Sequence, residues 1–185
     1  MRRVCLALLH FPVRDRAGET ITTAVTNLDL HDMARSARTY GLSDMFVVHP
    51  IGAQRDLVQR VQDHWITGSG ARRIPERTPA LQLLRVVESV DQVFDAVGSG
   101  RQGVELWTTS AQPRDCMLSY PQARDRVRAD GPPIVLAFGT GWGLAASIEA
   151  AADVHLEPIC PQIDSGFNHL SVRAACAITL DRLFG

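Results

Sequence analysis

The sequence predicts an α/β fold in which helices flank a parallel sheet. Short apolar runs alternate along the chain with helical segments, and runs such as 4–9 (VCLALL) and 134–138 (IVLAF) are apolar throughout. Strands of that kind are buried on both faces, which is typical of parallel sheets. The length of 185 residues, with 45% hydrophobic and 21% charged residues, predicts a single domain over residues 1–185.

Glycines, prolines and capping residues divide the chain into elements. Gly41 ends the first helical segment, and Asn27 or Asp29 is expected to cap its start. Gly, Pro and Arg dominate residues 68–79, which predicts a loop. Strands are expected at 4–9, 45–49, 81–87, 104–109, 134–138 and 154–156. Helices are expected at 28–40, 53–65, 90–97, 120–130, 144–152 and 170–184, with a loop or irregular hairpin at 11–26, a turn at 98–103 and a loop at 159–167.

Composition narrows the function classes. The formal net charge of −1 gives no general reason to expect nucleic acid, although all 19 cations are arginines. No apolar run approaches the roughly 18 residues of a membrane span, and the apolar start is too short for a secretory segment. We therefore expect a cytoplasmic protein with no membrane partner. The four cysteines lack metal-like spacing, so we expect buried thiols and no metal.

A glycine-rich turn, FGTGWGL at 138–144, follows the most apolar strand. A strand, a glycine turn and a helix form the place where α/β folds bind ligands, because glycine lets the backbone approach the ligand closely. The run is not a dinucleotide-binding fingerprint, since Leu144 stands where the third glycine is needed, and a chain without lysine has no P-loop. A tight turn that simply requires glycine is the alternative.

Two other polar clusters stand at helix starts. LEPI at 156–159 precedes FNHLSV at 167–172, where helix capping is the alternative to chemistry. Nearer the N-terminus, Asp29, His31 and Arg35 crowd the start of the first helix. His31 and Arg35 are four residues apart and share a face, although a solvated first turn is the alternative.

Together these regions resemble the three characteristic regions of the SPOUT superfamily of methyltransferases, which use S-adenosylmethionine and act mostly on RNA. The first region reads approximately N-x-G-x-x-x-R-[ST]-A and ends in a glycine. Residues 35–37 (RSA) and Gly41 match it, whereas Asp29 and His31 depart from it.

The second and third regions match in part. In the second, roughly G-x-E-x-x-G-L, Gly143 and Leu144 match and Thr140 replaces the glutamate. In the third, roughly N-V-S-V-A, residues 169–172 (HLSV) match. The runs ALLHFPV, TTAVTNLDLHDMARSARTYG, FGTGWGLA, LEPI and FNHLSVRAACAITLDRLFG resemble a bacterial branch of predicted SPOUT-class RNA methyltransferases. This resemblance extends from Leu6 to Gly185.

The resemblance implies a SPOUT-type fold over the whole single domain, with a deep trefoil knot in its C-terminal third. S-adenosyl-L-methionine would bind in the knot among three loops, held largely by backbone groups. The cofactor-binding residues implied in this way are Thr109, Ser110, Phe138, Gly139, Thr140, Gly141, Gly143, Leu156, Glu157, Pro158, Ile159, His169, Leu170 and Ser171.

The resemblance also implies a homodimer whose active site is completed across the interface, and an RNA substrate, tRNA or rRNA. The closing helix at 170–184 carries a wide apolar stripe, so we expect it in that interface. Arginines are the expected RNA contacts. They are Arg72, Arg73 and Arg77 in one predicted loop, and Arg124, Arg126 and Arg128 in one predicted helix.

Three residues are expected to act on the substrate. In the resemblance Arg35 takes part in catalysis, and a guanidinium with a pKa above ~12 suits orientation of the substrate better than proton removal. His31 has a pKa better matched to moving a proton. Asn27, with Asp29, is placed to orient either of them.

Two other function classes stay open. The departures at Thr140 and His31 are compatible with a non-catalytic knotted module that binds RNA or the cofactor. An unrelated enzyme of small nucleotides on a doubly wound sheet would have an unknotted chain and would lack the C-terminal loop of the pocket.

Overall fold

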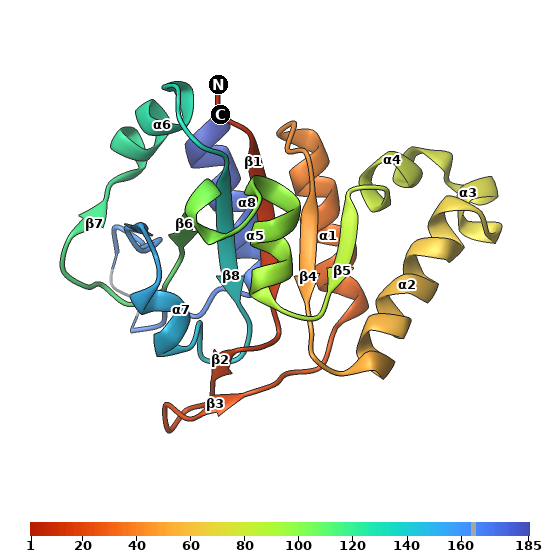
Figure 1. Ribbon diagram of the computed structural model, residues 1–185, viewed down its shortest axis with the longest axis horizontal. Helices are drawn as coiled ribbons and strands as arrows, with labels where there is room; N and C mark the ends of the chain where they lie inside the picture. The colour runs from red at the N-terminus through yellow and green to blue at the C-terminus, as the bar shows by residue number, and fades with distance from the viewer. Residues whose placement is uncertain (164–165) are drawn as a thin grey trace.

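The computed structural model describes residues 1–163 and 166–185, and in them it shows a seven-stranded sheet flanked by helices (Figure 1). The strand order is β5-β4-β1-β8-β6-β9-β7, and every pair is parallel. The strands are β1 Val4–Leu9, β4 Met45–Val48, β5 Leu84–Val87, β6 Glu105–Thr108, β7 Met117–Leu118, β8 Ile134–Gly139 and β9 Val154–Leu156. A separate antiparallel pair, β2 Val13–Arg14 and β3 Thr20–Ile21, forms a hairpin after β1.

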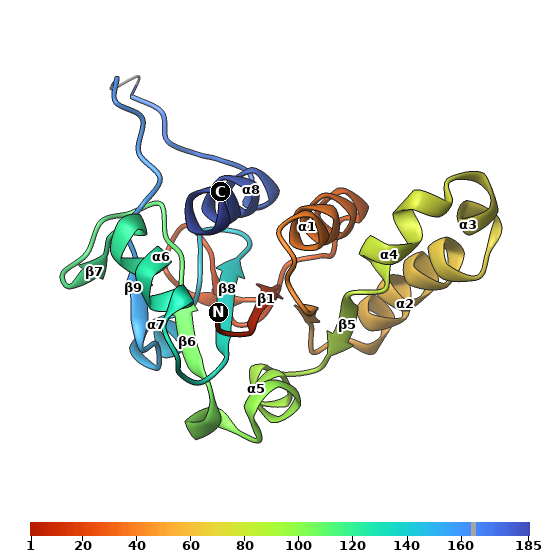
Figure 2. The same ribbon diagram turned by 90° about the horizontal axis from the view of Figure 1, so that it is seen from above.

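Helices cover both faces of the sheet (Figure 2). They are α1 Asn27–Thr39, α2 Gly52–Ile66, α3 Ser69–Arg73, α4 Thr78–Leu81, α5 Val90–Gly98, α6 Tyr120–Arg128, α7 Ala146–Ala150 and α8 Val172–Phe184, with 3-10 turns η1 Pro75–Arg77 and η2 Arg101–Gly103. Alternate residues of β1 point to opposite faces. Leu6 and Leu8 pack with α1, α6 and α8, whereas Ala7 and Leu9 pack with α5 and α7.

The predicted α/β class, the parallel sheet and the six predicted strands are confirmed, as is the irregular hairpin at 11–26. The loop predicted at 68–79 is wrong: its residues form α3, η1 and the start of α4. The helix predicted at 144–152 is shorter, and β7 was not predicted. Residues 164–165 of the loop predicted at 159–167 lie outside the described residues.

The first helix begins one residue earlier than predicted. Its cap is Thr26, whose hydroxyl accepts a hydrogen bond from the Asp29 amide, so the prediction of Asn27 or Asp29 as the cap is wrong. Asn27 already has a helical position, and the Asp29 carboxylate accepts from the Thr26 hydroxyl instead. Gly41 follows the helix with a φ of +74°, which confirms it as the residue that ends α1.

The thiols correct another prediction: Cys5 and Cys176 are buried, but Cys116 and Cys160 are exposed. None of the described helices combines the length and hydropathy needed to cross a membrane. Residues 1–163 and 166–185 contain no group of three or more acidic, histidine or cysteine side chains suited to a metal ion.

Candidate functional site

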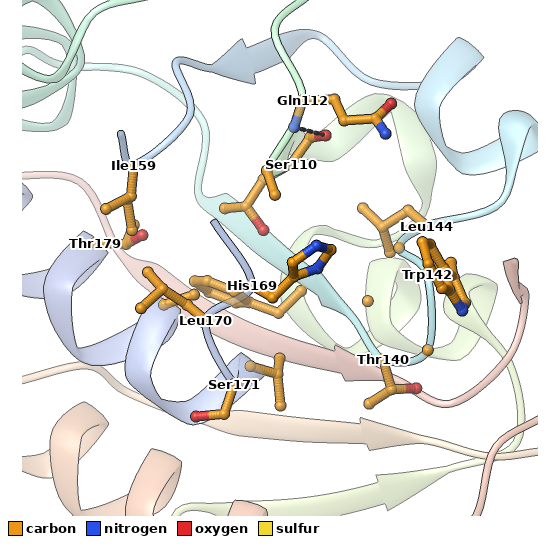
Figure 3. Close-up of a pocket in the computed structure, with 18 of the residues that line it drawn as sticks. Ser110, Gln112, Thr140, Trp142, Leu144, Ile159, His169, Leu170, Ser171 and Thr179 are labelled. Carbon is orange, nitrogen blue, oxygen red and sulfur yellow. Dashed lines mark hydrogen bonds between the residues drawn. The ribbon is translucent and has the colours of Figure 1, made fainter. Parts of the chain in front are cut away.

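A cavity of about 740 Å³ lies where β6, β8 and β9 end, beside the start of α8. The carboxyl ends of parallel strands meet at one edge of the sheet, and the chain after each strand supplies part of the wall. Figure 3 shows His169 directed into the space between Ser110, Thr140 and Trp142. The predicted cofactor residues that line this cavity are Thr109, Ser110, Phe138, Gly139, Thr140, Gly141, Gly143, Glu157, Ile159, His169, Leu170 and Ser171.

The glycines of the turn after β8 are required by its geometry. A Cβ on Gly139 would lie 2.6 Å from the backbone nitrogen of Leu144, and one on Gly141 would lie 2.9 Å from the carbonyl oxygen of Arg14. Gly141 and Gly143 also have positive φ values, +61° and +107°. The tight-turn alternative therefore holds for the backbone, and the same turn forms one wall of the cavity.

The hairpin after β1 braces this turn. The backbone N–H of Arg14 donates to the carbonyl of Gly143, and the N–H of Trp142 donates to the carbonyl of Arg14, both at 2.9 Å. The hydroxyl of Thr140 donates to the carbonyl of Leu9 at 3.1 Å and contacts the hydroxyl of Thr23. The polar segment between β1 and α1 is thus part of the site, although none of its residues before Asn27 was predicted as a site residue.

Charged side chains of both signs line the cavity: Arg14, Asp29, Glu149, Glu157 and Arg173. Arg14 and Arg114 both pair with Glu149, at 3.3 and 2.6 Å. Arg173 pairs with the buried Asp29 at 3.2 Å and joins α8 to α1. Arg14, Glu149 and Arg173 were not among the predicted site residues, although Arg14 and Arg173 directly follow the quoted runs ALLHFPV and FNHLSV.

Helix capping explains part of the C-terminal motif. The hydroxyl of Ser171 accepts from the amide of Ala174 and caps α8, as the capping alternative predicted. The Asn168 side chain donates to the carbonyl of Ile159 at 3.1 Å and ties the two ends of that loop together. The imidazole of His169 makes ring contacts with Trp142, at 6.2 Å between centroids, and Phe167, at 5.1 Å.

The three residues predicted to act on substrate lie outside the cavity lining. Asn27 and Arg35 are exposed on α1. His31 is buried against the edge of Trp65, with ring centroids 5.2 Å apart, and burial, followed by the charge of Arg77, lowers its pKa. From the same helix start, Asp29 does line the cavity.

Two predicted cofactor residues and several arginines also lie elsewhere. Leu156 is buried in the core, and neither it nor Pro158 lines the cavity in the described chain. The guanidinium of Arg77 stacks on Trp65, 4.8 Å from the ring centroid. Of the α6 arginines, Arg124 donates to the carbonyl of Arg182 and Arg126 pairs with Glu105. By contrast, Arg72, Arg73 and Arg128 are exposed.

A parallel α/β sheet with a ligand cavity at the carboxyl ends of its strands defines a protein that binds a small molecule at a sheet edge. The family model described as "SAM-dependent RNA methyltransferase" matches residues 3–185, and the chain belongs to that family. The resemblance predicted from the sequence is therefore confirmed.

Relatives and solved structures agree with this assignment. A protein of Aquifex aeolicus described only as uncharacterized is 37% identical over 182 residues, covering 98% of this chain and 88% of its own length. A tRNA (guanine-N(1)-)-methyltransferase of Nitratidesulfovibrio vulgaris is 36% identical over 184 residues, and this chain spans only 42% of its length. The SpoU methyltransferase AviRb of Streptomyces viridochromogenes, solved with AdoMet, has a TM-score of 0.58 at 16% identity, covering 99% of this chain and 57% of AviRb. The predicted SPOUT-type α/β fold is confirmed.

The cavity suits S-adenosylmethionine, the cofactor of the family. Its size lies within the roughly 300–1,000 Å³ range of small-molecule sites. The cofactor combines a sulfonium and an ammonium with one carboxylate, and the lining offers three carboxylates and two guanidinium groups. Apolar side chains such as Ile159 and Leu170 lie across the cavity from the polar turn, as Figure 3 shows, and would pack against the adenine.

Proposed function

We propose that this chain transfers a methyl group from S-adenosylmethionine to a nucleotide of tRNA or rRNA, in the cytoplasm. The observation that carries the proposal is the cavity walled by the glycine turn 139–143, the segment after β9 and the start of α8, in a chain of this family. The Nitratidesulfovibrio relative is named as a tRNA methyltransferase, which supports tRNA as the substrate. We take residues 1–185 to act as one SPOUT methyltransferase domain.

The chain's residues act mainly by binding and orientation. When bound, S-adenosylmethionine supplies an activated methyl group on sulfur, so the protein has to hold the acceptor in line with that group. The glycine turn and the segments at 156–159 and 169–171 hold the cofactor side. On the acceptor side we assign Arg35 to orienting a phosphate or a base edge, and Asn27 to orienting the same group.

A homodimer would bring the acceptor side to the cofactor side. Arg35 and Asn27 are exposed on α1 and do not line the cavity of their own chain, so a second copy of the chain is proposed to supply them. Ala174, Ala177 and Ile178 on α8 are only partly buried and do not line the cavity, which supports a role for this helix in the interface. A deep trefoil knot in the C-terminal third is part of the same proposal.

A non-catalytic module is the second candidate. The observation that favours it is the separation of Asn27, His31 and Arg35 from the cavity within one chain. Such a module would bind the cofactor or RNA and transfer no methyl group.

The test is methyl incorporation from radiolabelled S-adenosylmethionine into RNA of a strain that lacks the protein. We expect incorporation into tRNA or rRNA, and sedimentation at micromolar concentration above the 20.3 kDa of one chain. Cofactor binding without incorporation into any RNA would favour the module. Failure of millimolar cofactor to give heat or a thermal shift would reject the methyltransferase and any module that binds the cofactor, and would leave only a module that binds RNA.

A further inference from the structure

Two buried histidines hold one threonine beside the cofactor cavity. His10, directly after β1, and His49, directly after β4, are both fully buried, and their ring centroids lie 5.6 Å apart. His10 Nδ1 lies 3.0 Å from Thr23 Oγ1, and His49 Nε2 lies 2.9 Å from the carbonyl oxygen of Thr23. The Thr23 N–H donates to the carbonyl of His10. Every polar group of Thr23 is therefore engaged by this pair or by the turn it contacts.

The hydrogen bonds determine which nitrogen of each ring carries the proton. The hydroxyl of Thr140 donates to the carbonyl of Leu9, so the Thr23 hydroxyl donates to Thr140 and must accept from His10 Nδ1–H. His49 Nδ1 accepts from the amide of Ile51, so His49 Nε2–H donates to Thr23. The two rings thus carry their protons on opposite nitrogens. Burial, followed by the nearby His49, lowers the pKa of His10 to about 4 and keeps it neutral.

Of the two ring nitrogens of His10, Nδ1 forms a hydrogen bond to a described residue and Nε2 does not. Its Nε2 is buried and has no hydrogen-bond partner in the part of the chain that the structure describes. A buried nitrogen without a partner lowers the stability of a fold, and an apolar side chain would avoid that loss. The interaction that accounts for this histidine is therefore the hydrogen bond that its Nδ1–H donates to Thr23. Thr23 in turn contacts Thr140 in the cavity wall.

We propose that His10 is a positioning residue of the cofactor site: through Thr23 it holds Thr140, and with it the glycine turn 139–143, in the conformation that binds S-adenosylmethionine. The proposal rests on the cofactor site proposed above. In this proposal His10, Thr23 and Thr140 act as a single hydrogen-bonded unit that spans the end of β1, the segment before α1 and the turn after β8. His49 supports this unit by fixing the backbone of Thr23.

Binding of S-adenosylmethionine by calorimetry tests the proposal. Thr23→Val removes only the central hydroxyl at nearly constant volume, and we expect it to weaken binding about tenfold. His10→Leu should weaken binding to the same extent. The double variant should lose no more than either single one, because both break the same chain of hydrogen bonds. Thr23→Ser and His10→Asn keep the donor and should bind like the wild type.

Two further measurements separate positioning from folding. Leu84→Ala opens a hole in the core at β5, far along the sheet from the cavity, and should lower the melting temperature without weakening binding. Nitrogen-15 spectra of the histidine rings should show the proton on Nδ1 of His10 and on Nε2 of His49, and the His10 signal should shift when cofactor binds.

The outcomes are distinct. If the wild type binds no cofactor, the proposed site and the role of His10 fail together. If the wild type binds and both Thr23→Val and His10→Leu bind equally well, only the role of His10 is overturned. Should His10→Leu fail to fold, Thr23→Val alone decides.

Discussion

The cofactor cavity and the exposed face of α1 differ in how far one chain completes them. The described residues that line the cavity all come from one chain: the ends of three strands, the turn after β8 and the start of α8. Its turn is fixed by hydrogen bonds from the hairpin and from Thr23. On α1, in contrast, Asn27 and Arg35 are exposed and lie outside that wall.

This difference indicates how the proposed activity is divided. The residues proposed to bind the cofactor lie together in one chain, whereas the residues expected to hold the acceptor are exposed on α1. An arginine that is exposed in one chain can enter a site when a second copy covers the cavity, because a two-fold interface brings one residue of the shared patch against a different residue of the partner's patch. Substitutions in the cavity lining should therefore change cofactor binding, and substitutions on α1 should change turnover.

The largest effect is expected at the turn. Gly143→Val should abolish cofactor binding, since a side chain at φ +107° strains the turn and its Cβ would lie 3.6 Å from the guanidinium of Arg14, which lines the cavity. Calorimetry measures the loss.

Gly100→Val is the matched control for Gly143→Val. Gly100 also has a positive φ, +110°, and lies outside the cavity lining; in the described residues a Cβ there would lie 3.9 Å from a carboxylate oxygen of Asp95. We expect this control variant to lower the stability of the fold and to leave cofactor binding intact. Equal binding by Gly143→Val and the wild type would contradict the assignment of the turn.

A smaller effect, confined to turnover, is expected on α1. Arg35→Ala should lower methyl transfer by about 100-fold, because a misplaced reactant costs that much, with cofactor affinity and melting temperature nearly unchanged. Arg38→Ala is the control, since Arg38 is equally exposed one turn further along. If Arg35→Ala transfers methyl groups as fast as Arg38→Ala does, Arg35 is not part of the site, and His31 becomes the residue to test.

The smallest effect is on stability against pH. Burial lowers the pKa of His10 to about 4 from the ordinary value of 6.5, so the unfolded chain binds more protons in this range and stability falls as pH falls. Between pH 6.5 and 5 this group should remove about 2 kcal/mol from the free energy of unfolding. His10→Asn should flatten the slope, as urea unfolding at each pH will show.

His31, in the other region, offers a comparison for His10. Its pKa is lowered in the same direction by burial, so His31→Asn should also flatten the slope of stability against pH. An unchanged slope in both variants would mean that the fold does not lower the pKa of either imidazole.

The elements that the sequence predicts well are those with a strong local pattern. The strand at 134–138 is apolar throughout, and FGTGWGL directly after it predicts the turn that walls the cavity. Local sequence patterns do not predict elements whose conformation depends on contacts with residues that are distant in the sequence. Residues 69–81 form short helices that pack on α1 and α2, whereas the Thr26 cap is a local contact with the Asp29 amide three residues along, a pattern that the sequence already contains.

The parts of the site that sequence could not predict come from distant segments. Arg14 and Glu149 are 135 residues apart and pair at one wall of the cavity. His10, Thr23 and Thr140 form one chain of hydrogen bonds from three segments that the sheet brings together. No spacing in the sequence encodes such contacts, because they depend on which strands become neighbours.

Complementation between two inactive variants tests the division most directly. Gly143→Val lacks the cofactor wall, and Arg35→Ala lacks the acceptor arginine. Coexpressed and purified together, they should recover about a quarter of wild-type methyl transfer, because half of randomly assorted dimers are mixed and each mixed dimer has one intact site. A mixture no more active than its two components would contradict a site completed by a second chain.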